Sequence, residues 1–142
     1  MYLVLAGMGS LVAALLHVGC IIGGPAWYRA FGAGERMAQM AARGHWYPTL
    51  VTLAIATVLT CWGLYALSGA GIIRPLPLLK PILCLITAIY LARGLFFALL
   101  QPHFPNNSMA FWYWSSGICL ALGLLHLLGL YQSWSSLSRG AI

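Results

Sequence analysis

The sequence predicts an all-α membrane protein, built as an up-down bundle of four transmembrane helices. The chain is 62% hydrophobic and only 6% charged, and it contains four nearly uninterrupted apolar stretches. About twenty helical residues cross a bilayer core of about 30 Å. In lipid, a helix satisfies its backbone hydrogen bonds within one segment, whereas an open sheet leaves its edges unpaired. We expect helices at residues 2–22, 49–68, 80–100 and 109–131.

We expect these helices to form one integral membrane domain, residues 1–142, in the bacterial cytoplasmic (inner) membrane. No Lys or Arg precedes Arg29, whereas a secretory signal peptide begins with a positively charged region. The first apolar stretch is therefore interpreted as a retained helix of a multi-pass protein. The Lys and Arg residues of the connections favour neither side of the membrane, so orientation stays open and dual topology is an alternative.

The first connection should lie at the membrane interface. It begins with Gly-Gly-Pro at residues 23–25, which should end the first helix, and it mixes arginine with aromatic residues. Within residues 33–44, two methionines and an alanine recur at helical spacing, opposite Arg36 and Arg43. This pattern favours a short interfacial amphipathic helix, and a plain anchored loop is the alternative.

Prolines and aromatic residues delimit the remaining helices. Pro48 suits the first turn of the second helix, and Gly69 follows its last turn. Pro81 lies near the start of the third helix, and Pro102 follows its end. The fourth helix opens with the aromatic run 111–114, which is typical of the membrane interface.

Small residues recur along one side of the first two helices, where they favour close helix packing. These residues are Gly9, Ala13, Cys20 and Gly24 in the first helix, and Thr49, Thr52, Ala56, Thr60 and Gly63 in the second. We interpret both stripes as helix contacts rather than as the lining of a pore.

The shortage of acidic residues excludes several function classes. The chain contains one Asp or Glu in total, which is Glu35. It cannot build a pair of catalytic carboxylates, a carboxylate-rich calcium or magnesium site, or a serine triad oriented by Asp within one subunit. The net charge of +6 is spread over connections beside helix ends, where it suits anionic lipid, so no nucleic-acid partner is expected.

Arg93 needs the most explanation because it lies well inside the third predicted helix. An arginine at the bilayer centre costs about 3 kcal/mol on insertion scales. Its guanidinium should therefore point toward acceptors or a wet cavity. The candidate acceptors are Glu35 folding back, carbonyls freed by the break at residues 23–25, or an anion from outside the chain.

These considerations predict a polar pocket between the first, third and fourth helices. By helix rise, His17 and Arg93 lie roughly 8 Å and 11 Å from the same face of the membrane. The expected ligand-binding residues are Arg93, His17, Glu35, His45, His103, Tyr90 and Trp112. The fourth helix adds a polar seam of Ser115, Cys119 and His126.

Neither a metal nor a haem group is expected, and the cofactor stays unknown. His17 and His126 differ by roughly 15 Å in height, too far apart for the two axial ligands of one haem iron. A haem between His17 and either His45 or His103 is an alternative. Another is a zinc or copper site formed by Cys20, His17, His45, Met37 and Met40. The four cysteines stand apart in the sequence, without close metal-binding spacing.

The leading functional hypothesis is a transporter or channel for an anionic or polar small solute or a lipid headgroup. A homo-oligomer or a partner membrane subunit is expected, because four short helices enclose little room. The alternative is a membrane-embedded enzyme or redox subunit acting on a lipid, quinone or isoprenoid, with His17 as acid/base and Glu35 as its orienting partner. A further alternative is an accessory subunit of a membrane complex.

Overall fold

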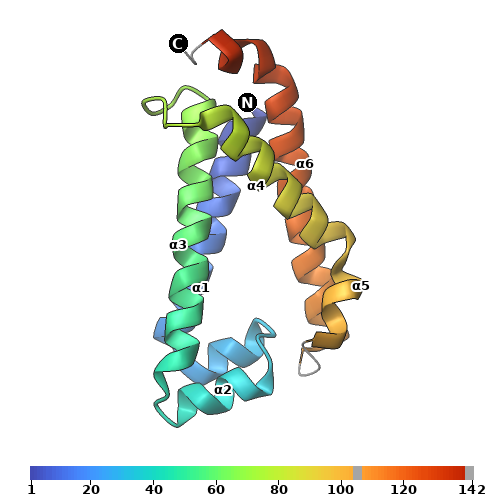
Figure 1. Ribbon diagram of the computed structural model, residues 1–142. Coiled ribbons are helices and arrows are strands. Elements are labelled where there is room, and N and C mark those ends of the chain that lie inside the picture. The colour runs from blue at the N-terminus through green and yellow to red at the C-terminus, as the bar shows by residue number, and fades with distance from the viewer. Residues whose placement is uncertain (104–106, 140–142) are drawn as a thin grey trace.

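The computed structural model describes residues 1–103 and 107–139, which contain helices and connections but no strand. Four long helices form two antiparallel pairs, α1 with α3 and α4 with α6 (Figure 1). The elements are α1 (Tyr2–Ala30), α2 (Glu35–Ala42), α3 (Trp46–Gly69), α4 (Leu79–Leu95), α5 (Phe97–Leu100), the 3₁₀ helix η1 (Gln101–His103) and α6 (Met109–Arg139). The predicted all-α class is confirmed.

Within the described residues, three helices are long and apolar enough to cross a membrane: α1, α3 and the Met109–Leu137 part of α6. The fourth long helix, α4, has 17 residues and is about 26 Å long. The chain then bends by 74° into residues 97–103, and only the two pieces together qualify as a span. The prediction of several apolar helices is confirmed, whereas residues 80–100 do not form one straight helix.

The bend after α4 has no proline at its centre, and tertiary packing accounts for it. A Cβ at Gly94 would lie 2.8 Å from the backbone nitrogen of Leu120, so α4 and α6 touch backbone to backbone here. Just beyond, the ring of Phe97 meets that of Tyr113 edge to face, with centroids 5.8 Å apart. Contacts with α6 therefore hold the chain on both sides of Phe96.

The Gly-Gly-Pro sequence interrupts α1 as predicted, so Tyr2–Ala30 consists of two helical segments that meet at a kink. Gly24 alone has non-helical angles, with φ 62° and ψ −147°, and the helix resumes at Pro25. The positive φ needs a glycine, and proline suits the first turn of the continuation. A Cβ at Gly23 would lie 2.1 Å from the Trp27 indole, so this position also needs a glycine.

The short helix α2 packs its apolar face on the bent end of α1. Ala38 is buried against Cys20 and Tyr28, with Met37 partly buried beside them. The Tyr28 hydroxyl forms a 3.1 Å hydrogen bond with Thr52 of α3. The predicted amphipathic helix is confirmed over residues 35–42, and its apolar face meets protein.

Glycines bring the helices of each pair together. A Cβ at Gly7 of α1 would lie 3.0 Å from the carbonyl oxygen of Gly63 in α3, and a Cβ at Gly123 of α6 would lie 2.9 Å from Leu91 of α4. Where lipid replaces water, such close backbone approach is a main source of helix association. The prediction that Gly63 marks a helix contact is confirmed.

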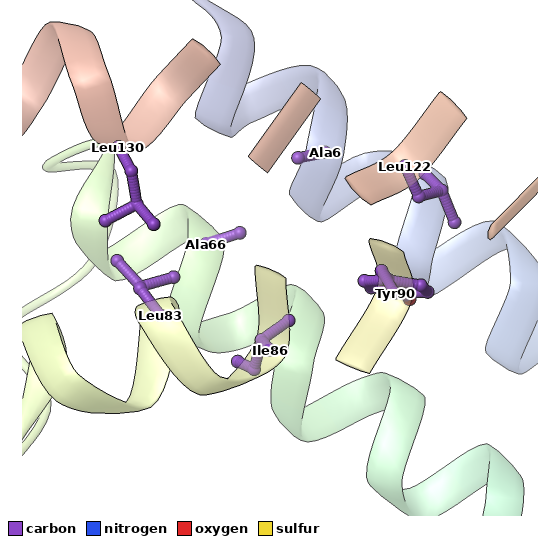
Figure 2. Packing of buried hydrophobic residues seen from close by; sticks show 7 residues of the cluster. All are labelled: Ala6, Ala66, Leu83, Ile86, Tyr90, Leu122 and Leu130. Carbon is purple, nitrogen blue, oxygen red and sulfur yellow. The ribbon is translucent and has the colours of Figure 1, made fainter. Parts of the chain in front are cut away.

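The two pairs meet at the end that carries the N-terminus and diverge toward α2 and α5 (Figure 1). Their junction contains the main buried core, to which all four long helices contribute (Figure 2). Its buried residues are Ala6, Ala66, Leu83, Ile86, Tyr90, Leu122 and Leu130.

Candidate functional site

Arg93 lies in the last turn of α4 and reaches across to α6. Its Nη1 donates a 2.9 Å hydrogen bond to Oγ of Ser116, and its Nη2 donates a 3.0 Å bond to Oγ of Ser115. The central guanidinium carbon lies 4.9 Å from the centroid of the Trp112 ring, close enough for a cation–π contact. The structure therefore brings together three predicted site residues, Arg93, Trp112 and Ser115.

Arg93 forms no ion pair with a carboxylate side chain. The single acidic residue, Glu35, is held by Arg29: Nε donates to Oε2 and Nη2 to Oε1, both at 2.9 Å. Arg93 has five N–H donors, and the two serine hydroxyls are the only hydrogen-bond acceptors that the described residues offer it. No carboxylate side chain therefore neutralises the half-buried guanidinium, and some of its N–H donors have no acceptor among the described residues.

Arg93 lies closer to a helix end than its sequence position suggested. The prediction placed it about seven residues before Leu100, but α4 ends at Leu95. Its partner Ser115 lies six residues into α6, or about 9 Å from the start of that helix. The helix dipole favours a cation in a last turn, although the carbonyl ends of a helix neutralise it only in part.

A second group of polar residues lies in the main core. Oγ of Ser10 and the hydroxyl of Tyr90 are 2.9 Å apart, and both residues are buried. The rings of Tyr90 and His126 lie 5.2 Å apart between centroids, and Cys119 packs against the same core. Tyr90 and His126 were predicted in a ligand pocket and a polar seam, and the structure places them together inside the bundle.

The other predicted site residues lie apart from both groups. Nδ1 of His17 bonds to the carbonyl of Ala13 in its own helix, at 2.7 Å. His103 is exposed in η1. His45 is exposed before α3 and lines an open cavity of about 440 Å³ with Tyr28, Trp46 and other residues. No hydrogen bond among the described residues links these histidines to Arg93.

Glu35 fastens α2 to the end of α1 in a pH-dependent way. The hydrogen bond from Arg29 holds the pKa of the Glu35 carboxyl below its usual range. A lowered pKa stabilises the folded state above the pKa of the unfolded chain, and this contribution is lost as pH falls through the folded value. We therefore expect α2 to exchange its amide protons faster, relative to α3, in acid than at neutral pH.

Hydrogen–deuterium exchange of the protein in lipid nanodiscs measures this effect, after correction for intrinsic exchange rates. Glu35→Gln should remove the pH dependence and leave α2 equally loose at both pH values. Gln39→Ala is the matched control, since Gln39 makes only a 3.3 Å bond to Glu35. Unchanged relative protection of α2 in Glu35→Gln would show that the ion pair does not hold this helix.

Sequence reasoning missed two serines that the structure places at these sites. Ser116 receives a shorter hydrogen bond from Arg93 than the predicted Ser115 does, and Ser10 is fully buried beside Tyr90. Each is a small polar residue within an apolar run, which is a signal present in the sequence. The sequence does not show which helix face each serine occupies relative to Arg93 or Tyr90.

The described residues contain no group of three or more His, Cys, Asp or Glu side chains placed to hold a metal ion. No family model, curated protein or solved structure matches this chain.

Proposed function

We propose that this chain is a multi-pass membrane protein that acts as a transporter or channel for a small anionic solute or an anionic headgroup, with Arg93 as its selectivity element. The observation that carries the proposal is a half-buried guanidinium whose described partners are neutral hydroxyls and an indole. Serine hydroxyls orient the cation without neutralising it. The missing counter-charge is the ligand.

Electrostatics supports an anion at this position. An arginine within an apolar helix is costly unless it is paired or wet, and such residues generally mark ion or substrate pathways. Planar guanidinium groups bind carboxylate and phosphate oxygens through two parallel N–H donors. The Ser115 hydroxyl also lies 3.4 Å from the Trp112 carbonyl, a contact that turns its lone pairs toward Arg93. The cation is therefore held in a fixed orientation.

Arg93 bonds to Ser116 of α6 from the last turn of α4, and the α4–α6 pair diverges from α1 and α3 toward that end of the molecule (Figure 1). Large apolar side chains are exposed along all four long helices, including Leu15, Leu53, Leu85 and Trp114. These surfaces suit lipid and a second copy of the chain, so we expect a homo-oligomer to complete a passage.

The enzyme alternative receives less support from this geometry. It requires Glu35 to orient His17, but Glu35 bonds to Arg29 while His17 bonds to the backbone of its own helix. The Ala13 carbonyl orients the His17 ring, so Glu35 does not take the role that this alternative assigns to it. No observation favours this alternative over the anion site.

Anion flux in proteoliposomes tests the proposal, with chloride, phosphate and acetate as probes. Arg93→Gln should lower the flux of the transported anion at least tenfold, because it removes the positive charge. Arg93→Lys keeps the charge but loses the two-pronged geometry, so partial flux is expected. The control is Arg36→Gln, which removes one exposed positive charge from α2.

Protein that remains folded is identified by its elution profile and thermal unfolding, so a loss of flux can be assigned to the site. Equal flux in the wild type and in folded Arg93→Gln would remove Arg93 from any role in selectivity. A comparable loss in Arg36→Gln would point to total surface charge instead.

A further inference from the structure

The core at the junction of the helix pairs contains a polar cluster with one residue from each long helix. Ser10 of α1 shares a hydrogen bond with Tyr90 of α4, and Tyr90 packs between Trp62 of α3 and His126 of α6. The ring centroids of Tyr90 lie 4.8 Å from Trp62 and 5.2 Å from His126. Figure 2 shows Tyr90 of α4 within this core, beside Leu122 of α6. The Ser10–Tyr90 bond joins one helix pair to the other.

One ring nitrogen of His126 has a hydrogen-bond partner, and the other has none among the described residues. Its Nδ1 lies 2.9 Å from the carbonyl oxygen of Leu122, and a carbonyl can only accept, so Nδ1 carries a proton. In the neutral ring Nε2 is then an unprotonated acceptor. Nε2 has no hydrogen-bond partner among the described residues, and His126 is 0% exposed. A lone pair is thus buried without a donor.

The hydroxyls of Ser10 and Tyr90 supply a hydrogen-bond donor that matches this acceptor. Ser10 and Tyr90 carry one O–H donor each, and their shared hydrogen bond uses one of the two. One donor and one acceptor therefore remain in the same buried cluster. Buried polar groups in native proteins are nearly always paired, so an unpaired acceptor beside a spare donor calls for an explanation.

His126 is the residue of this core whose ordinary pKa lies closest to neutral pH. The other titratable residues packed on the core are Tyr65 of α3, Cys84 and Tyr90 of α4, and Cys119 of α6, while α1 contributes the Ser10 hydroxyl. Phenols and thiols are ordinarily neutral near pH 7, whereas histidine is the side chain that changes charge between about pH 5 and 8. None of these neighbours supplies a counter-charge.

We propose that His126, with Tyr90 and Ser10, forms a proton-binding site, and that a proton bound there moves together with the anion bound at Arg93. This inference rests on the proposed function and deepens it to proton-coupled anion transport. A proton from water forms one N–H bond at Nε2 and later leaves the same atom. No other bond breaks, and no electron is transferred.

The two sites are connected through the same pair of helices. Tyr90 and Arg93 are one turn apart on α4, while Ser116 and His126 are ten residues, or about 15 Å, apart on α6. An anion bound at Arg93 adds the negative charge that a protonated His126 lacks in this core. Proton binding and anion binding should therefore strengthen each other, and such coupling is reciprocal.

The ¹⁵N resonances of the histidine rings, measured on the full chain in nanodiscs from about pH 8 to pH 4, test proton binding directly. His126→Gln assigns the signal. We expect the Nε2 resonance of His126 to move from the unprotonated to the protonated position, and chloride or phosphate to shift its midpoint upward. A His126 that keeps an unprotonated Nε2 throughout this range, in folded protein, would overturn the proposal.

Proton uptake into proteoliposomes loaded with a pH-sensitive dye, driven by an anion gradient, tests the coupling. His126→Gln should lower proton uptake per transported anion at least tenfold. His17→Gln should leave it unchanged, although His17 also bonds a carbonyl four residues earlier. Anion flux that carries no protons in the wild type overturns proton coupling alone, whereas absence of anion flux in the wild type overturns the proposed function.

Discussion

Gly94→Ala is expected to force α4 away from α6 and to lower the free energy of unfolding by about 1–3 kcal/mol, the usual cost of overpacking. The added Cβ would lie 2.8 Å from both the backbone nitrogen and the Cβ of Leu120. Backbone cannot move aside as a flexible side chain can. Because Arg93 is the preceding residue, the same displacement should move its guanidinium from the two serines and reduce anion flux. Thermal unfolding in detergent and flux measurements check the two effects.

Gly117→Ala provides the matched control on α6. A Cβ at Gly117 meets nothing within 4 Å, and alanine is the better helix former by up to about 1 kcal/mol. We expect this variant to be as stable as the wild type or slightly more stable, with normal flux. If Gly94→Ala behaves like Gly117→Ala, the close approach of α4 and α6 at this position is wrong.

Removing the two serine hydroxyls that hold Arg93 is the second large effect. A hydrogen bond to a charged group contributes about 1.5–3 kcal/mol, so Ser115→Ala with Ser116→Ala should cost about 3 kcal/mol, the low end for two bonds at a half-buried site. The guanidinium would then lack its described acceptors on α6. Anion flux should fall as well, because the cation is no longer oriented.

A double-mutant cycle separates this effect from the loss of the serines themselves. In an Arg93→Leu background, the same two serine substitutions should cost less than about 1 kcal/mol, because no buried charge is left unpaired. Equal costs in the two backgrounds would show that Arg93 draws no stability from the serines, despite distances of 2.9 and 3.0 Å.

Much of the fold could be predicted because bilayer thickness and helix rise relate apolar length directly to structure. The break after the first helix follows from the Gly-Gly-Pro sequence: Gly24 has a positive φ and interrupts α1, and a second helical segment begins at Pro25. The break at Phe96 has no local signal, because it depends on the contacts of Gly94 and Phe97 with α6.

Part of the candidate site was predicted. The sequence identified the types of residue that form it, but mostly not their contacts. Arg93 and Trp112 stood out as a cation and an aromatic residue near a helix entrance, and they do meet. The pairing of Glu35 could not be assigned from charge alone. Arg29 lies six residues away, and a short loop closes at a smaller entropic cost than the long connection to Arg93.

Contacts between residues far apart in the sequence could not be predicted, because packing sets how each helix is rotated about its own axis. Ser10 and Tyr90 are eighty positions apart, and only the assembled bundle aligns their hydroxyls. The depth estimate for Arg93 depended on a helix end at Leu100, and the earlier end at Leu95 changed it. Tertiary contacts thus decide the parts of the site that periodicity and helix rise leave open.

The most direct measurement is the ¹⁵N–¹H resonance of the Arg93 Nε in zwitterionic lipid nanodiscs, assigned by its absence in Arg93→Lys. Titration with chloride and phosphate, and a parallel series of nanodiscs containing phosphatidylglycerol, distinguishes a dissolved anion from a lipid headgroup. We predict a saturable shift in one of the two series. An Arg93 resonance that responds to neither the dissolved anions nor the anionic lipid would contradict an anion site at this residue.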